Sequence, residues 1–350
     1  MKTKHLTLTF FVLIALTVAL FTVDLATGSV YVPIGDVVNA LLGEKVSSKG
    51  LKDIVLIFRL PKALTALAGG AALSTSGLML QTLFRNPLAG PSILGITSGA
   101  SLGVALVILG AGCGLSGAGF LGDLGLGGNL LLIASSALGA AVVMFMVLIL
   151  ASRVRNIMTV LIVGILGSFA ISSVVSVLVH FSRPEMVQAY LAWTFGSFAS
   201  VTWDQLKVFF PLTVTLVATS TLMGKPLNVL LLGEDYSRSM GLDPWKIQML
   251  VLGITAILVG CVTAFCGPIG FIGIAVPHLA RALLGTSDHR ILLAANALLG
   301  SSTALLADLV AQLPGYRAIL PMNAVTALLG SPVIIWFILK RSRKGSGPFV

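Results

Sequence analysis

The sequence predicts an all-α protein that crosses a membrane many times, and three observations lead to this prediction. Of the 350 residues, 57% are hydrophobic and 10% are charged, whereas soluble domains carry roughly 25% charged residues. Apolar runs long enough to span a bilayer as a helix recur along the chain. The 38 glycines suit helices that approach closely in lipid, where small residues form the contacts.

The apolar runs define the expected helices in chain order. The first run follows Lys2 and Lys4, and its length of about 20 residues favours a retained helix over a cleaved signal peptide. Eight runs have spanning length and two are shorter or interrupted, which predicts about ten transmembrane helices and both termini on one side. The eight are residues 6–27, 61–83, 130–151, 157–179, 206–223, 246–266, 291–313 and 321–339, and the two are 92–111 and 270–284.

The basic residues predict which side holds the termini. If both termini are cytoplasmic, 14 of the 22 Lys and Arg residues fall on the cytoplasmic side, in line with the preference of basic segments for that side. The basic segment 45–52, which would then be outside, opposes this bias. The same preference explains the net charge of +10 without any binding of nucleic acid.

Two interrupted helices mark the expected translocation pathway. Residues 69–83 form an apolar helix that breaks at Arg85-Asn-Pro87 and continues as a shorter helix, and residues 253–277 repeat this plan. A break inside a membrane leaves backbone groups that need partners, so breaks persist only where they are buried or line a water-filled path. If residues 57–180 and 246–340 are each a four-helix unit, the two units have opposite orientations, as in inverted-repeat transporters.

The segment between the sixth and seventh runs predicts two short helices, 228–232 and 234–240, joined at Gly233 and stopped by Gly241. An apolar patch on such a loop indicates a partner surface, although an amphipathic helix lying on lipid headgroups has the same pattern. The patch consists of Leu230, Leu231, Leu232, Tyr236 and Met240.

No catalytic residue, cofactor or metal site is expected. The sequence contains neither an H-E-x-x-H motif nor a G-x-x-x-x-G-K-[ST] nucleotide loop, so any ATPase is expected to be another chain. Asp308 is the best candidate for an acid within a span, with a cap or a pair with Arg317 as the structural alternative. His278 is expected at a helix start or an interface, with contact to substrate as the alternative, and Cys261 and Cys266 are expected in buried packing.

Four groups of residues carry a resemblance that covers nearly the whole chain. They are Arg59-Leu-Pro-Lys62; Gly77-x-x-x-Gln81 with Arg85-Asn-Pro-Leu-Ala-Gly-Pro91; Leu232-Gly-Glu-Asp-Tyr236; and Gly267-Pro-Ile-Gly-Phe-Ile-Gly273 with Pro277-His-x-x-Arg281. These motifs resemble the permeases of iron-siderophore, haem and cobalamin importers, the FecCD or BtuC type of ABC transporter. The resemblance implies a type II importer permease, a single domain over residues 1–350, in a bacterial or archaeal cytoplasmic membrane.

The resemblance also implies partners. Permeases of this family form homodimers, bind two cytoplasmic ATPase subunits and receive substrate from an extracytoplasmic binding protein, so the chain itself is not expected to be an enzyme. The ATPase-coupling element maps onto about residues 225–242, with Leu230, Leu232, Gly233, Glu234, Asp235, Tyr236, Arg238 and Gly241 as the expected site residues.

The family further implies a cytoplasmic gate. It maps onto the break after the second run and onto the turn after the fourth run, where Ile157 and Met158 are larger and more apolar than the small hydroxyl residues usual in the cobalamin permease. The expected gate residues are Asn86, Pro87, Leu88, Asn156, Ile157 and Met158.

Docking of the binding protein maps onto Arg59 and Lys62. Lys62 replaces a second arginine of the family and therefore lacks bidentate geometry. The third docking position is occupied by Gln312, and Arg317 is the candidate that substitutes for it.

The substrate expected first from the family is an iron chelate, either a ferric siderophore or haem, with cobalamin as the alternative. A secondary carrier or channel would work without partner chains but needs coupling-ion sites inside the spans. A membrane-embedded enzyme needs a carboxylate or histidine cluster at one membrane face. Neither feature is visible in the sequence, so ATP-driven import is the favoured hypothesis.

Overall fold

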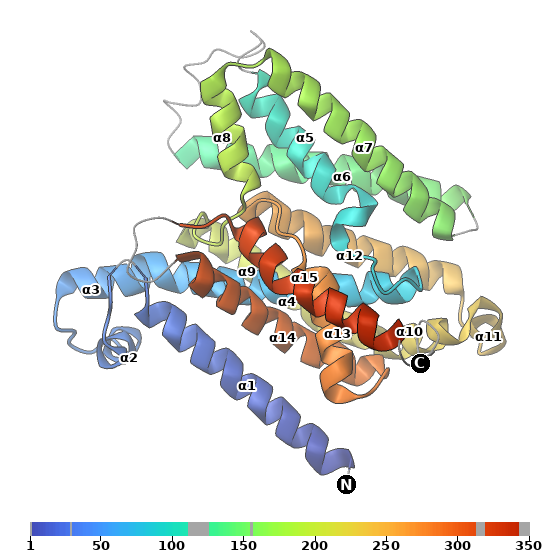
Figure 1. The fold of residues 1–350 in the computed structure, drawn as a ribbon, viewed down its shortest axis with the longest axis horizontal. Helices are drawn as coiled ribbons and strands as arrows, with labels where there is room; N and C mark the ends of the chain where they lie inside the picture. The colour runs from blue at the N-terminus through green and yellow to red at the C-terminus, as the bar shows by residue number, and fades with distance from the viewer. Residues whose placement is uncertain (1, 29, 111–125, 155–156, 313–318, 343–350) are drawn as a thin grey trace.

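The computed structural model describes residues 2–342 except for 29, 111–125, 155–156 and 313–318, and these described ranges contain helices and no β-strand (Figure 1). The π-helical turn Ile54–Arg59 leads into the second long helix, and the 3₁₀ turns are Pro91–Leu94 and Thr221–Met223. The helices are α1 (Lys2–Ala26), α2 (Ile34–Leu42), α3 (Lys49–Asp53), α4 (Leu60–Leu83), α5 (Ile96–Ile108), α6 (Leu126–Arg153), α7 (Ile157–Phe181), α8 (Pro184–Thr194), α9 (Trp203–Ser220), α10 (Gly224–Leu232), α11 (Glu234–Ser239), α12 (Pro244–Cys266), α13 (Ile272–Leu284), α14 (His289–Gln312) and α15 (Met322–Ser342).

Each of the ten apolar runs expected from the sequence contains a helix, which confirms the all-α polytopic architecture. The number of membrane crossings stays a prediction, because α5, α13 and the apolar part of α15 are shorter than a full span. In the described part of the chain, seven helical segments are long and apolar enough to cross: Leu6–Ala26, Lys49–Leu83, Leu130–Arg153, Ile157–Phe181, Trp203–Leu232, Pro244–Cys266 and His289–Gln312.

Three helices that the sequence analysis did not predict lie in connecting segments. α2 and α3 lie between α1 and α4, and α8 lies between α7 and α9. They are too short to give a spanning hydropathy signal. The run predicted at 92–111 also starts later as an α-helix, because Gly95 has a φ of 76° and separates the turn Pro91–Leu94 from α5.

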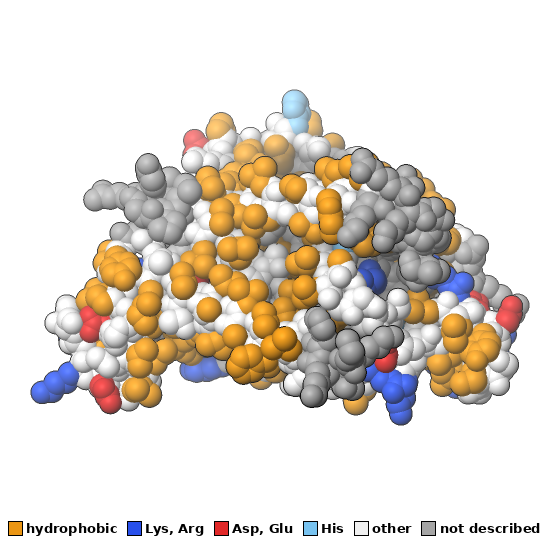
Figure 2. Space-filling view, turned by 60° about the horizontal axis from the view of Figure 1, so that its bottom comes forward, with side chains coloured by type: hydrophobic (Ala, Val, Ile, Leu, Met, Phe, Trp, Pro, Cys, Tyr) orange, Lys and Arg blue, Asp and Glu red, His pale blue; other side chains and the backbone are white. Residues whose placement is uncertain are grey.

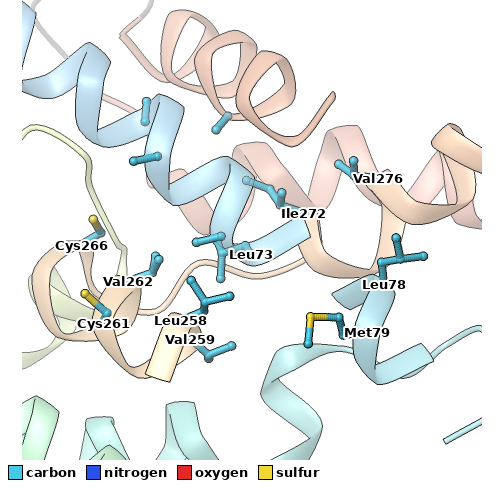
Figure 3. Packing of buried hydrophobic residues seen from close by; sticks show 14 of the residues in the cluster. Leu73, Leu78, Met79, Leu258, Val259, Cys261, Val262, Cys266, Ile272 and Val276 are labelled. Atoms are coloured by element: carbon cyan, nitrogen blue, oxygen red, sulfur yellow. The ribbon is translucent and has the colours of Figure 1, made fainter. Parts of the chain in front are cut away.

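α4 is the central helix and is buried along almost its whole length (Figure 1). It packs against α9, α12, α13 and α14. Figure 3 shows its side chains Leu73, Leu78 and Met79 in the apolar core that α12 and α13 also line. The same core contains Cys261 and Cys266, which are free thiols and buried, as predicted.

The neighbours of α4 come close enough for backbone-to-backbone contact at two glycines. A Cβ built on Gly77 would overlap the carbonyl oxygen of Gly273 in α13, and a Cβ on Gly70 would overlap that of Gly300 in α14. Membrane helices gain van der Waals contact by this kind of close approach, since lipid gives no hydrophobic driving force between them. The two glycines therefore set how tightly α13 and α14 pack on α4.

The first helices of the two predicted four-helix units, α4 and α12, run in opposite directions. α4 ends beside α10, because the Arg85 side chain after it reaches the Leu230 carbonyl. α12 begins at that same end, where Gln248 bonds Glu234 of α11. The helices on either side of the two breaks also match in length, with 24 and 13 residues in α4 and α5 and 23 and 13 residues in α12 and α13.

The bundle has two distinct ends, which we call the α10–α11 end and the α2–α3 end. The start of α1 and the end of α15 lie at the α10–α11 end (Figure 1). Figure 2 shows a face in which apolar side chains cover the middle and charged side chains lie mainly toward the two ends. This is the distribution expected for a protein whose middle is in hydrocarbon.

We predict that Gly77→Ala lowers the free energy of unfolding by at least 1–3 kcal/mol, roughly the cost of overpacking a core, because the new methyl group meets backbone that cannot rotate away. Thermal unfolding of the purified protein in detergent measures this.

The matched control is Gly253→Ala in α12, where a Cβ meets open space. Alanine favours a helix over glycine by about 1 kcal/mol, so this variant should be as stable as the original or more stable. Equal stability of both variants would contradict the proposed close packing.

Candidate functional site

The break after α4 is a well-formed helix end. The N–H of Arg85 donates to Thr82 O at 3.2 Å and the N–H of Asn86 donates to Gln81 O at 3.1 Å, the two bonds of a Schellman motif. The Asn86 side chain then accepts from the N–H of Leu88 at 2.9 Å. These three bonds satisfy part of the backbone groups of the break from within the segment itself.

α13 holds the same segment from one side. His278 Nε2 donates to Pro87 O at 2.7 Å, Arg281 Nη1 donates to Gln81 Oε1 at 2.7 Å, and Gln81 Nε2 donates to Ile274 O at 3.2 Å. The prediction that His278 begins a helix is wrong, because α13 starts at Ile272 and contains Pro277 internally. Its ring is buried and faces the break instead.

The coupling element predicted from the sequence consists of α10 and α11. Gly233, with a φ of 119°, separates the two helices, and Gly241, with a φ of 77°, follows the second, as predicted. The predicted apolar patch is smaller than expected: Leu232, Tyr236 and Met240 are 64%, 49% and 58% exposed, but Leu230 is only 5% exposed and packs inward.

α10 is tied to the rest of the bundle through polar groups that the sequence analysis did not single out. Asn228 Nδ2 donates to Asp288 Oδ1 at 2.6 Å, and Asn228 Oδ1 accepts from the backbone N–H of His289 at 2.8 Å. The Asn228 hydrogen bond lowers the pKa of the Asp288 carboxyl. These residues carry no motif, and only their convergence in space identifies them.

The second predicted gate segment is described in part. Ile157 and Met158 begin α7, and Met158 is 39% exposed. α7 packs against the turn Pro91–Leu94, which follows the first break. Asn156 lies outside the described residues.

The predicted docking residues Arg59 and Lys62 lie at the α2–α3 end, and both are buried, at 7% and 6% exposure. Lys62 Nζ pairs with Asp24 at 3.1 Å and with Asp308 at 2.7 Å. Gln312 Nε2 donates to both carboxylates, at 3.0 and 2.6 Å. This cluster joins α1, α4 and α14.

Arg59 stabilises a neighbouring part of the α2–α3 end. Its guanidinium donates to the Leu25 and Val30 carbonyls and is close enough to Asp24 to interact electrostatically with it. It thereby ties the segment after α1 to the start of α4. The third expected docking residue, Arg317, lies outside the described residues. Among the described residues, Asp308 forms its salt bridge with Lys62.

The break between α12 and α13 is held by Asn323, which the sequence analysis missed. Asn323 Oδ1 accepts from Gly270 N at 2.9 Å and its Nδ2 donates to Thr194 O at 2.9 Å. Its own N–H donates to Phe195 O at 3.1 Å. One asparagine therefore joins the start of α15, the end of α8 and this second break.

Comparison with solved structures identifies the class of protein. An inward-facing metal-chelate type ABC transporter is similar over 94% of this chain and 98% of its own chain, with a TM-score of 0.81 and 29% identity. PsaBC from Streptococcus pneumoniae shares the fold alone, with a TM-score of 0.52 and 14% identity over 87% of this chain and 95% of its own. The fold and the two broken helices therefore define a multi-pass ABC importer permease.

The chain belongs to the FecCD transport family, whose model matches residues 16–340. Similar curated proteins include the vitamin B12 import system permease protein BtuC of Klebsiella pneumoniae, which is 39% identical over 87% of this chain and 87% of its own length. The protein of the same name from Salmonella typhimurium is 37% identical over 86% of this chain and 88% of its own length. The family expected from the motifs is thus confirmed.

We predict that Lys62→Met lowers the free energy of unfolding by roughly 3–5 kcal/mol, the usual cost of removing one partner of a buried pair, because two carboxylates would then share the site without the ammonium. Thermal unfolding checks this, and Lys62→Met combined with Asp308→Leu should restore part of the loss.

Lys207→Met is the control, since Lys207 pairs with Asp204 at the surface with both side chains more than 70% exposed. Exposed pairs contribute about 0–1 kcal/mol. If Lys62→Met unfolds at the same temperature as this control, the cluster does not stabilise the bundle.

Proposed function

We propose that this chain is the membrane subunit of a binding-protein-dependent ABC importer that moves a large metal chelate inward, driven by a separate ATPase chain. The observation that carries the proposal is the direct contact between the two-helix coupling element and the broken helix of the pathway: Arg85 Nη2 donates to Leu230 O at 3.0 Å. A passive pore has no need for an exposed two-helix element fixed to its constriction.

The surface of α10 and α11 suits an ATPase partner. Leu232, Tyr236 and Met240 form an exposed apolar patch, and Glu234 and Asp235 lie in the first turn of α11. Arg238 lies in its last turn. Apolar anchors with a charged rim are typical of protein–protein contacts. We propose that the ATPase binds here and that this end of the bundle, with both termini, is cytoplasmic.

At the opposite end we propose docking of the extracytoplasmic binding protein, near Arg59, Lys62 and Arg317. In the structure, Lys62 is neutralised by two carboxylates and Arg59 donates to backbone carbonyls. A carboxylate of the binding protein would therefore compete with these internal acceptors. The pathway itself is proposed to lie on the two-fold axis of a homodimer, with Asn86–Leu88 and Asn156–Met158 closing its cytoplasmic end.

For the substrate, we propose cobalamin as the first compound to test and an iron chelate, a ferric siderophore or haem, as the second. Cobalamin comes first because the similar curated proteins, at 37–39% identity, carry the vitamin B12 name. No buried acid is needed to drive transport, since ATP hydrolysis supplies the energy; the buried acids Asp24 and Asp308 are already paired with Lys62.

The test is uptake by proteoliposomes that contain this chain and its ATPase. We expect ATP-dependent accumulation of cobalamin, and ATPase activity stimulated several-fold, only when the binding protein is loaded. Stimulation by a ferric siderophore or by haem instead would reassign the substrate. Uptake that needs neither ATP nor the ATPase would contradict the proposal and favour a secondary carrier.

The coupling surface is tested separately. Glu234→Lys combined with Tyr236→Ala should weaken ATPase binding at least tenfold, a loss of about 1.4 kcal/mol, as measured by co-purification and titration. Phe11→Ala, which removes an aromatic side chain 69% exposed on α1, is the control and should bind normally. Equal ATPase binding by both variants would mean that α11 is not the contact.

A further inference from the structure

Arg85 has a backbone conformation that its residue type disfavours. It occupies the first position beyond the end of α4 with a φ of 47°, where a Schellman motif usually has glycine. In the described residues, Phe271 is the only other non-glycine residue with a positive φ, and it precedes α13 at the second break. A strained residue of this kind persists when its side chain does something that glycine could not do.

The hydrogen bond of the Arg85 side chain explains why arginine rather than glycine occupies this position. Its Nη2 donates to the carbonyl of Leu230 at 3.0 Å, which lies in the last turn of α10 and also accepts from Gly233 N. The final carbonyls of a helix lack partners within the helix, and a cation there also interacts favourably with the helix dipole. Arg85 thus caps the end of α10 although it directly precedes the gate segment Asn86–Leu88.

A second connection reaches the same turn of α4. Asn228 is oriented by donating to the Asp288 carboxylate and accepting from the His289 N–H, so its Oδ1 is an acceptor. His289 Nδ1, 2.8 Å from that oxygen, must then donate. In the neutral ring Nε2 is left as an acceptor, 2.7 Å from the Thr82 hydroxyl.

The two connections converge on one turn, and α13 holds the other side of it. Thr82 and Arg85 face α10 and α14, whereas Gln81 and Pro87 bond α13. The turn that leads into the gate segment is therefore hydrogen-bonded to α10 and α14 on one side and to α13 on the other. A displacement of α10 that α13 does not share must change the hydrogen bonds of this turn.

We propose that Arg85 is the positioning residue that transmits movement of the α10–α11 element to the gate segment Asn86–Leu88, and that Asn228, His289 and Thr82 form a parallel connection. This inference rests on the proposed function. The acceptor of Arg85 is the backbone carbonyl of Leu230, so the connection does not depend on a polar side chain in α10.

The experiment compares three variants of Arg85 in the complete complex with its ATPase and binding protein. Arg85→Gly removes the side chain and fits the positive φ, so it should be at least as stable thermally as the original protein. Arg85→Gln removes the charge and shortens the side chain, and Arg85→Lys keeps a donor. Lys246→Gln is the control, because Lys246 is 83% exposed and pairs only loosely, at 3.8 Å, with Asp243.

We expect Arg85→Gly and Arg85→Gln to hydrolyse ATP within about twofold of the original rate but to transport at least fivefold less substrate per ATP, with Arg85→Lys in between. The ratio of transport to hydrolysis is informative because a residue that only stabilises the fold would lower both together. Asn228→Ala added to Arg85→Gly should lower the ratio further.

A gate reporter gives a second measurement. Leu88 is 45% exposed, so a Leu88→Cys variant can be labelled with a maleimide, whereas Cys261 and Cys266 are buried. Cys113 is replaced by serine in all of these proteins. In the protein that keeps Arg85, vanadate trapping of the ATPase should change the extent of labelling at position 88. In the protein that carries Arg85→Gly, vanadate trapping should leave the labelling unchanged.

The outcomes separate this inference from the proposed function. If the original complex shows no ATP-driven uptake, the proposed function fails. If it does, and Arg85→Gly transports with the original ratio and keeps the vanadate-dependent labelling, then Arg85 does not connect the two elements and the inference is overturned.

Discussion

The close backbone contact of α4 with α13 and α14 is the constraint on which the rest of the structure depends. Gly77 against Gly273 and Gly70 against Gly300 leave no room for side chains between these helices. The half-helix α13 is therefore brought directly onto the end of α4, where Gln81, Arg281 and His278 can reach across. Without that approach, the hydrogen bonds that satisfy the first break would span too great a distance.

The two breaks solve the same physical problem with different side chains. Each break follows a long helix and leaves backbone groups that are costly where water cannot reach them. At the first break, the carbonyl of Pro87 is satisfied by His278, and at the second, the N–H of Gly270 is satisfied by Asn323. Because each donor or acceptor comes from another helix, neither break can move independently of its partner, and this dependence makes the breaks suitable as moving parts.

Much of the architecture could be predicted from the sequence. Hydropathy predicts the helices of spanning length, and Gly233 and Gly241 mark the ends of the two short helices α10 and α11. The short helices α2, α3 and α8 were missed because they carry no spanning signal. The break after α4 was predicted from Arg85-Asn-Pro87, but the partners of this turn, Thr82, Asn228 and His289, lie up to 207 residues apart in sequence. Leu230 was predicted to be exposed because periodicity over nine residues cannot tell which face of α10 packs inward.

The buried cluster of Lys62 constrains what the proposed docking end of this chain can do. An arginine at this position could present two donors to a partner carboxylate, but the lysine ammonium of this chain is enclosed by Asp24, Asp308 and Gln312. A buried ammonium leaves such a cluster only if an acceptor of equal quality replaces the two carboxylates, because an unpaired charge there is costly. The lysine therefore serves first to hold α1 to α4 and α14. If the binding protein docks at this end, as we propose, its selectivity depends on other groups there.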